Sequence, residues 1–405
     1  MIKPEEVELL SKSGGEGFGS SGRNRVSLLI KRLIGEAIEI RATDLHVEPE
    51  QKIVRIRARV DGFLRDLVEY DHDSGARIIS AIKVLCDLDI TRKSRMQDGS
   101  FSAKVRGKAV EFRVSSVEEV FGDKMVIRIL ETEPEIIGLE KLGLPAGMET
   151  SLRLFLTRSQ GMLLVSGPTG SGKSTTLYSM LREVDRKQRN VIAIEDPVEY
   201  HLEYMTQISV DANHGITFAN ALRTALRQDS NILMIGEVRD AETAGIAIQA
   251  GLTGHLVFST VHARDSVATI YRLLDLGVEP FLVANVLNLT LAQRLVRILC
   301  RQCRKRTDPD LNKIRKFGKE LEGVTAYGPR GCPDCENTGY HGRTGIFEMI
   351  PFSEKIRDMI LERASEDNLR RAVIAEGMVP MMRAAMEKVA AGITSIDEIE
   401  RVLGQ

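Results

Sequence analysis

The amino-acid sequence predicts an α/β protein: a domain built on a parallel sheet, a smaller α+β domain before it, and a tetracysteine module and helical tail after it. Apolar strands alternate with helical segments over residues 146–297, which is the pattern of a parallel sheet. Short strands of alternating polarity occupy residues 24–132. Two C-x-x-C pairs lie in residues 298–350, before the tail at 351–405. A length of 405 residues accommodates two or three domains.

The smaller domain, residues 24–132, begins with an amphipathic pattern that predicts a helix over 26–34. The dipeptide Asp61-Gly62 is a hairpin signal between two strands. Residues 1–23 are expected to be a flexible lead, because 12–22 are rich in glycine and serine. The expected strands cover 53–57, 63–68, 110–114 and 125–130.

A linker over 133–145 leads to the second domain and its most informative segment. Residues 167–174 fit the phosphate-loop pattern G-x-x-x-x-G-K-[ST] at every fixed position. The apolar run 162–165 before them predicts a buried strand, and 175–181 after them predict a helix. In that context glycines let backbone N–H groups face a phosphate, and the helix N-terminus favours an anion. A glycine-rich turn without a ligand is the disfavoured alternative.

The phosphate loop supplies the expected nucleotide and magnesium ligands. Lys173 is expected to reach the β- and γ-phosphates, and Ser174 to hold Mg²⁺. The expected nucleotide-binding residues are Gly167, Pro168, Thr169, Gly170, Ser171, Gly172, Lys173, Ser174 and Thr175.

Two later strands of the second domain end in acids. An apolar run from Val191 leads to Glu195 and Glu199, and the run 232–235 leads to Glu237. Ligands bind at the carboxyl ends of strands in such sheets, where NTPases place an acid that binds Mg²⁺ or positions water. Taken singly, each acid is equally consistent with a helix cap. Their order after a phosphate loop favours a nucleotide site.

A third strand, over 255–260, carries His255 at its start and is followed by His262. Either histidine alone is consistent with an ordinary polar residue. Because they follow the phosphate loop and the strand-end acids in the chain, we include both among the candidate site residues.

Four of the five cysteines form two C-x-x-C pairs, Cys300/Cys303 and Cys332/Cys335. This is four-thiolate zinc spacing, with a longer gap between the pairs than in common zinc ribbons. Four thiolates close a tetrahedral site, so a structural zinc is expected. Free thiols or a redox pair are the alternatives. Cys86 lies in an apolar run and is expected to be a small core residue.

Composition restricts the partners. The net charge is −1, which provides no overall attraction to nucleic acid or anionic lipid. An aromatic content of 5% offers no evident base-stacking platform. A nucleic-acid motor or zinc-dependent nucleic-acid binder is therefore the second hypothesis, based on a small basic cluster over 301–306. No apolar segment approaches the length of a membrane span, and no signal core is evident. A cytoplasmic protein is expected.

Taken together, the motifs resemble the secretion-ATPase superfamily, and specifically the assembly motors of type II secretion systems and type IV pili. The resemblance covers about residues 24–403, and the tetracysteine module matches the assembly and secretion branch. It implies a RecA-like second domain and a PAS-like first domain. The matching segments are the Walker A motif at 167–174, the Asp box at 194–199, the Walker B region at 223–240, the His box at 253–262, and first-domain residues 42–49 and 57–62.

The resemblance also implies roles for the candidate residues. Glu237 is the leading catalytic acid, with Glu195 and Glu199 as Asp-box acids near Mg²⁺ and water. His255 and His262 sense or stabilise the γ-phosphate. In the first domain, Arg113 and Arg128 match arginines that reach the nucleotide, although a solvated strand residue is the usual fate of such an arginine. Arg223, Arg227 and Arg239 are weaker candidates.

The family further implies a homo-hexameric ATPase that uses ATP, Mg²⁺ and Zn²⁺ and associates peripherally with the inner membrane. Its partners would be a platform protein and an adaptor of a pilus or secretion system. The resemblance leaves open a pilus, a secretion pseudopilus or a DNA-uptake fibre. No counterpart of the family's larger N-terminal docking domain is expected here. Met96 stands where the family often has proline, and Ala263-Arg264 replace its common Thr-Asn.

Overall fold

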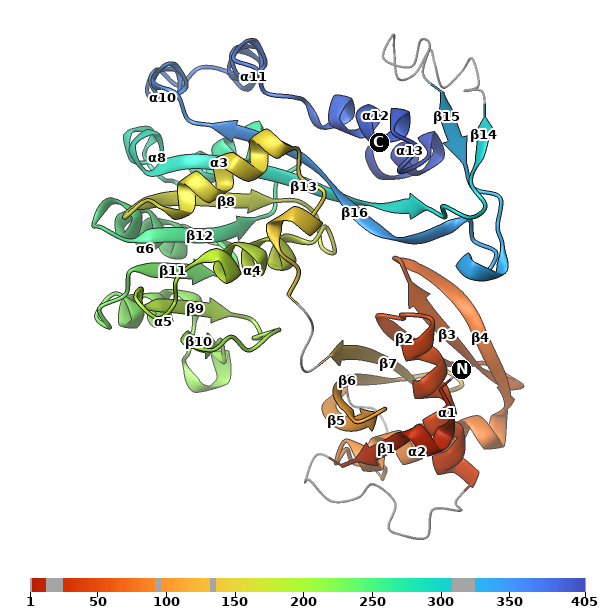
Figure 1. Cartoon of the computed structure of the whole chain (residues 1–405). Helices are drawn as coiled ribbons and strands as arrows, with labels where there is room; N and C mark the ends of the chain where they lie inside the picture. Colours follow the sequence, from red (N-terminus) through yellow and green to blue (C-terminus); the bar gives the residue numbers. More distant parts are fainter. Residues whose placement is uncertain (1, 12–24, 92–95, 132–135, 308–324, 405) are drawn as a thin grey trace. The chain divides into compact units, whose positions relative to one another are not determined.

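The computed structural model describes residues 2–11, 25–91, 96–131, 136–307 and 325–404. The chain divides into two compact units, Met1–Pro134 and Glu135–Gln405 (Figure 1).

The first unit is an antiparallel sheet covered on one face by two helices. Its strands lie in the order β1-β5-β6-β7-β2-β3-β4, and each pairs antiparallel with its neighbours. Residues alternate between buried and half-buried along β3, because successive side chains point to opposite faces. The elements are β1 (Val7–Leu10), α1 (Arg25–Glu39), β2 (Asp44–Pro49), β3 (Ile53–Val60), β4 (Phe63–Asp71), α2 (His72–Leu85), β5 (Gln97–Val105), β6 (Lys108–Glu119) and β7 (Gly122–Glu131).

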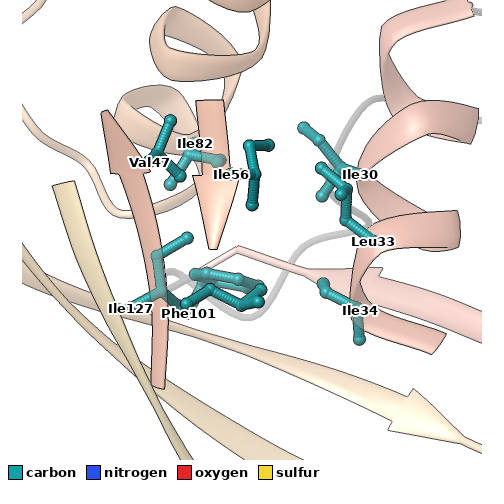
Figure 2. A pocket seen from close by; sticks show the side chains of 9 residues that line it. Ile30, Leu33, Ile34, Val47, Ile56, Ile82, Phe101 and Ile127 are labelled. Carbon is teal, nitrogen blue, oxygen red and sulfur yellow. The ribbon is translucent and has the colours of Figure 1, made fainter. Parts of the chain in front are cut away.

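The core of this unit lies between the two helices and the sheet. Figure 2 shows Ile30 and Leu33 of α1 together with Ile82 of α2, Ile56 of β3 and Phe101 of β5. These side chains line a cavity of about 10 Å³ with an entirely apolar lining. That volume is about one water-sized sphere, so this cavity is a packing defect and not a ligand pocket.

Local signals in the first unit are confirmed, and one expectation is corrected. Asp61 and Gly62 both have positive φ, 49° and 90°, as a two-residue hairpin turn requires. Within the expected flexible lead over 1–23, however, β1 pairs with β5 and buries Val7 and Leu9. The reason is that burial of these alternate apolar side chains holds the segment on the sheet edge. Residues 12–24 lie outside the described part of the chain.

The second unit is a mostly parallel sheet in the order β10-β9-β11-β12-β8-β13-β16. All neighbouring strands run parallel except β13 and β16. Every residue of β8, β11 and β12 is buried, as expected for strands covered on both faces. The strands are β8 (Gly161–Ser166), β9 (Val191–Glu195), β10 (Thr206–Ser209), β11 (Ile232–Ile235), β12 (Leu256–Val261), β13 (Leu287–Leu299) and β16 (Tyr340–Pro351).

Helices cover both faces of this sheet. One apolar cluster joins α3 (Ala146–Leu156) and α4 (Lys173–Glu183) to the strands. A second apolar cluster packs the other covering helices against the sheet. They are α5 (Phe218–Ala225), α6 (Ala241–Leu252), α7 (Ser266–Asp275), α8 (Pro280–Val286), α10 (Glu354–Leu361) and α11 (Glu366–Ala375).

The chain returns to the sheet after the cysteines. The sequence places the end of the second domain at residue 297 and assigns 298–350 to the zinc module. In the structure β16 pairs with β13 along most of its length, so the end of that segment belongs to the sheet. The remaining elements are β14 (Lys305–Thr307), β15 (Ala326–Gly328), α12 (Met381–Ala390) and α13 (Ile396–Leu403). Short 3-10 turns occupy Pro4–Glu6, Leu139–Lys141, Ala212–His214 and Pro333–Cys335.

Among the described residues, we find no helix with the length and apolar character that a bilayer crossing requires.

Candidate functional site

The phosphate loop connects a central strand to a helix, as the motif requires. Strand β8 lies between β12 and β13 and ends at Ser166, and α4 begins at Lys173. The loop needs its glycines. At Gly167, φ is +151°, and a Cβ there would lie 2.5 Å from Ser171 Oγ and 2.6 Å from the carbonyl oxygen of Gln293. Gly172 has φ of 88° at the helix N-cap. The backbone therefore adopts a shape that other residues would disrupt.

The N-terminus of α4 differs from those of α5, α6 and α7, the helices that follow the next strand ends of the same sheet. Thr217, Asp240 and Asp265 cap α5, α6 and α7 through side-chain oxygens that accept a backbone N–H. At α4 the N-cap is Gly172, which provides no such bond. The first N–H groups of α4 are thus left for another acceptor, and an anion is the acceptor that the helix dipole favours. The hydroxyl of Ser171 is also buried without a partner in the described structure.

Lys173 lies across the loop. Its ammonium donates hydrogen bonds to the carbonyl oxygens of Gly167 at 2.9 Å and Pro168 at 3.1 Å. Burial lowers the pKa of Lys173, while the negative charge of Glu237 raises it. Ser174 is the second residue of α4 and is half-buried.

Glu237 and His262 lie together at the carboxyl edge of the sheet. Glu237 follows β11 and forms an ion pair with Arg239, and its other oxygen lies 3.6 Å from Nε2 of His262. Strands β11, β12 and β8 are adjacent and parallel, so this pair and the phosphate loop lie at the same edge of the sheet. The site therefore contains an ammonium, a carboxylate and an imidazole beside one helix N-terminus.

The two Asp-box acids occupy different environments. Glu195, the last residue of β9, is only 5% exposed. It accepts hydrogen bonds from the Tyr178 hydroxyl at 2.5 Å and from Gln207 Nε2 at 3.1 Å. Burial raises the pKa of Glu195. Glu199 is exposed to solvent.

The structure separates the two candidate histidines. Strand β12 pairs with β8 from Leu256 opposite Gly161 to Val261 opposite Ser166. His262 therefore follows the strand at the phosphate-loop edge. His255 lies at the other edge, where its Nδ1 is 3.2 Å from the carbonyl oxygen of Ala250. The expectation that both histidines meet the γ-phosphate is corrected for His255, because a six-residue strand lies between them.

The candidate arginines of the first unit lie side by side on its sheet. Arg113 on β6 is directly opposite Arg128 on β7. Arg128 Nε donates to Asp44 Oδ1 at 3.1 Å, and Arg113 Nε lies 3.8 Å from Glu111. In the second unit, the weaker candidates Arg223 and Arg227 also have local partners: Glu242 at 2.7 Å and the Arg223 carbonyl oxygen at 2.8 Å.

The four C-x-x-C cysteines converge. Their sulfur atoms all lie within 4.8 Å of one another. Cys300 and Cys332 are 3.8 Å apart, and Cys303 and Cys335 are 3.7 Å apart. Tetrahedral zinc with bonds of about 2.3 Å separates its sulfurs by about 3.8 Å, so the cluster fits that ion.

Backbone amides favour a thiolate in this cluster. Cys335 Sγ accepts hydrogen bonds from the backbone N–H groups of Cys332 at 3.3 Å and Gly339 at 3.1 Å. Burial raises the pKa of Cys335, but these bonds outweigh burial and lower it to about 7. A thiolate is the form that binds a metal.

Comparison with known proteins agrees with this geometry. The family described as "Type II/IV secretion system protein" matches residues 20–401. The chain belongs to this family of secretion ATPases. It is 41% identical over 376 residues to the type II secretion system ATPase E of Vibrio cholerae, covering 92% of this chain and 74% of that protein. It is also 41% identical over 399 residues to protein HxcR of Pseudomonas aeruginosa, covering 98% and 80%.

Solved structures show the same fold. The Legionella pneumophila ATPase DotB superposes with a TM-score of 0.70 at 21% identity, covering 95% of this chain and 97% of DotB. The pilus retraction motor PilT, crystallised with bound ADP, gives a TM-score of 0.64 at 25% identity, covering 91% and 95%.

The structure of this secretion ATPase adds residues that the sequence analysis did not single out. Gln293 on β13 is 1% exposed and contacts the phosphate loop. Arg294 follows it, and Tyr178 and Gln207 hold Glu195. The sequence did offer a sign of Gln293: a glutamine in a largely apolar strand is buried, and a buried amide needs hydrogen-bond partners.

Proposed function

We propose that this secretion ATPase hydrolyses ATP with Mg²⁺ as a homo-hexamer and powers assembly of a type IV pilus or a type II secretion pseudopilus. The observation that carries the proposal is the gathering of Lys173, Glu237 and His262 beside the uncapped N-terminus of α4. A cation, a carboxylate and an imidazole at the carboxyl edge of a parallel sheet suit phosphoryl transfer to water.

Each residue has a distinct task in that reaction. The loop N–H groups and Lys173 bind the phosphates, and the hydroxyl of Ser174 is a ligand for Mg²⁺, which neutralises charge on the phosphate chain. Glu237 orients a water molecule whose oxygen attacks the γ-phosphorus and accepts its proton. The bond from the γ-phosphorus to the bridging oxygen breaks, which yields ADP and phosphate. His262 contacts the γ-phosphate. Glu195 is buried, and its hydrogen bond from the Tyr178 hydroxyl holds the carboxyl end of β9 in place.

We propose further that Arg113 and Arg128 stabilise charge on the transferred phosphoryl group, as the family resemblance implies. One zinc ion is proposed for Cys300, Cys303, Cys332 and Cys335, where it would close the cluster structurally. The proposed partners are a platform protein and an adaptor at the cytoplasmic face of the inner membrane. Their support is the relationship to type II secretion ATPases.

Two substitutions test the proposal. Lys173→Ala should sharply weaken ATP binding, while Glu237→Gln should retain binding and lose turnover by about a hundredfold or more. Glu362→Gln, an exposed acid after α10, is the matched control and should hydrolyse ATP normally. Binding is measured by fluorescent-nucleotide titration and turnover by phosphate release. Normal turnover of Glu237→Gln would refute its role and redirect attention to Glu195 or Glu199.

A further inference from the structure

Strand β13 extends beyond the end of β8 and along the phosphate loop. Ala292 is opposite Ser166, the last residue of β8, so the next residues of β13 lie beside the loop (Figure 1). The side chain of Gln293 fixes this arrangement: its Nε2 donates to the Ser171 carbonyl oxygen at 2.8 Å, and its Oε1 accepts from the Thr176 hydroxyl at 2.8 Å. The C-terminal end of the loop and the first turn of α4 are thereby tied to β13.

Arg294 is brought to the loop by the same strand. Its guanidinium donates to the carbonyl oxygen of Gln293 at 2.9 Å and to that of Arg264 at 2.6 Å. The Gln293 carbonyl oxygen in turn lies against Gly167, 2.6 Å from where a Cβ would be. Since Lys173 donates to the Gly167 carbonyl oxygen, both cations are adjacent to the first glycine of the loop.

Neither cation has a carboxylate partner within the described residues. Lys173 and Arg294 bond only to main-chain carbonyl oxygens, whereas Arg239 and Arg370 form ion pairs with acids. Burial is the largest cause of the lowered pKa of both Lys173 and Arg294, and the charge of Arg294 lowers the pKa of Lys173 further. The nearby charges of Glu237 for Lys173, and of Asp265 and Glu348 for Arg294, offset this only in part. Two partly desolvated cations that repel each other are stabilised by an anion between them or beside them.

We propose that Arg294 is a second phosphate-binding cation, which acts with Lys173 on the phosphate chain of the nucleotide. This inference rests on the proposed function and adds a residue to it. Arg294 also holds the carbonyl of Arg264, two residues after His262. Binding of phosphate by Arg294 would therefore orient the His262 segment at the same time.

Charge-preserving and charge-removing substitutions in the full chain test the proposal. The probe is a fluorescent ATP analogue with Mg²⁺, titrated against each variant. Arg294→Gln retains an N–H donor for the Arg264 carbonyl but removes the charge, and its Kd should rise about tenfold or more. Arg294→Lys retains the charge, and its Kd should stay within about threefold of wild type. Arg272→Gln removes an exposed charge from α7 and should bind normally.

The outcomes separate this inference from the nucleotide site itself. A normal Kd for Arg294→Gln, or equal losses in the Gln and Lys variants, overturns the role of the charge. If Lys173→Ala loses binding and Arg294→Gln does not, only this inference fails. If neither variant loses binding, the proposed nucleotide site fails. Thermal unfolding checks the fold, and Arg294→Met replaces the glutamine variant if that variant does not fold.

Discussion

The two sheets of this secretion ATPase present polar groups in different ways. Along β3 in the first unit, buried residues alternate with half-buried ones. Along β8 and β12 in the second unit, every residue is buried. The first sheet therefore has charged side chains along a whole face, whereas the parallel strands of the second have room for them only where strands end.

The pKa values of two glutamates, one on each sheet, shift in opposite directions. On the first sheet, the Arg57 guanidinium bonds to Glu48 and lowers its pKa to about 2. At the end of β9 in the second sheet, burial raises the pKa of Glu195. On an exposed strand face, a cation on the neighbouring strand stabilises the carboxylate. At a buried strand end, the loss of water destabilises the carboxylate more than its hydrogen bonds stabilise it. The candidate site residues of the second sheet therefore lie at its edge, and the following predictions test the contrast between the two sheets.

Metal removal should have the largest effect and should spare the first unit. A structural zinc contributes of order 10 kcal/mol to local folding. Leu299 N donates to the Ile393 carbonyl oxygen at 2.8 Å, which ties the cysteine module to the tail before α13. In Cys335→Ser we expect loss of about one zinc per chain and faster hydrogen exchange over α13, with β3 unchanged.

Elemental analysis and hydrogen exchange read out this experiment. Cys86→Ser is the matched control, because Cys86 is buried in the first unit and should leave the zinc content intact. A metal-free protein with native exchange in α13 would contradict the structural role of zinc.

Shortening a buried side chain in the core of the first unit should have the next largest effect. Phe112 stacks on Phe101 with ring centroids 4.7 Å apart, and both are buried. Phe112→Ala should lower the free energy of unfolding by about 3–5 kcal/mol, measured by urea denaturation. Phe121→Ala, in a hairpin where the side chain is 45% exposed, should cost much less. Equal losses in the two variants would show that the helix-covered face is not the core.

Arg113 tests whether the charged face of the first sheet takes part in hydrolysis. Arg113→Ala should lower kcat about tenfold or more while ATP affinity changes little, because the guanidinium acts on charge that develops during transfer. Arg77→Ala on the exposed side of α2 is the control. Specific activity should also fall on dilution if the active form is a hexamer. Full activity in a demonstrably monomeric sample, or a silent Arg113→Ala, would be the contrary result.

The smallest expected effects are the pH dependences of the two carboxyls. Glu48 has a folded-state pKa of about 2, below its ordinary value of 4.5. Its ion pair with Arg57 therefore stabilises the fold above about pH 4.5 and is lost as pH falls toward 2. Glu48→Gln should cost about 1–2 kcal/mol at pH 7 after allowance for partial exposure, and the cost should shrink on acidification.

Glu195→Gln should change the free energy of unfolding in the opposite direction to Glu48→Gln. Because burial raises the pKa of Glu195, ionisation of this group costs stability as pH rises above its ordinary value. The glutamine variant should be neutral or more stable at pH 7 and show no gain at pH 4. Urea denaturation across this pH range measures both variants. If the change in unfolding free energy followed the same pH dependence in Glu48→Gln and Glu195→Gln, the contrast between the exposed face of the first sheet and the buried edge of the second would be wrong.

Local features of the chain could be predicted from the sequence alone. The strand expected over 162–165 and the helix over 175–181 are β8 and α4, on either side of the phosphate loop. The Asp61-Gly62 turn follows in the same way. These features depend on periodicity and on backbone freedom within a few residues. The sequence also allows the prediction that His255 and His262 lie at opposite ends of one strand, because six strand residues separate them.

Only the tertiary structure decided which distant segments meet. No local pattern shows that β16 returns to pair with β13, and this pairing corrects the boundary placed at residue 297. The partners of Glu195, the convergence of the cysteine sulfurs and the position of Arg294 at the phosphate loop also depend on sheet order. Spacing along the chain identifies the residue types that a site needs. Packing of segments far apart in sequence determines which of them touch and which are desolvated.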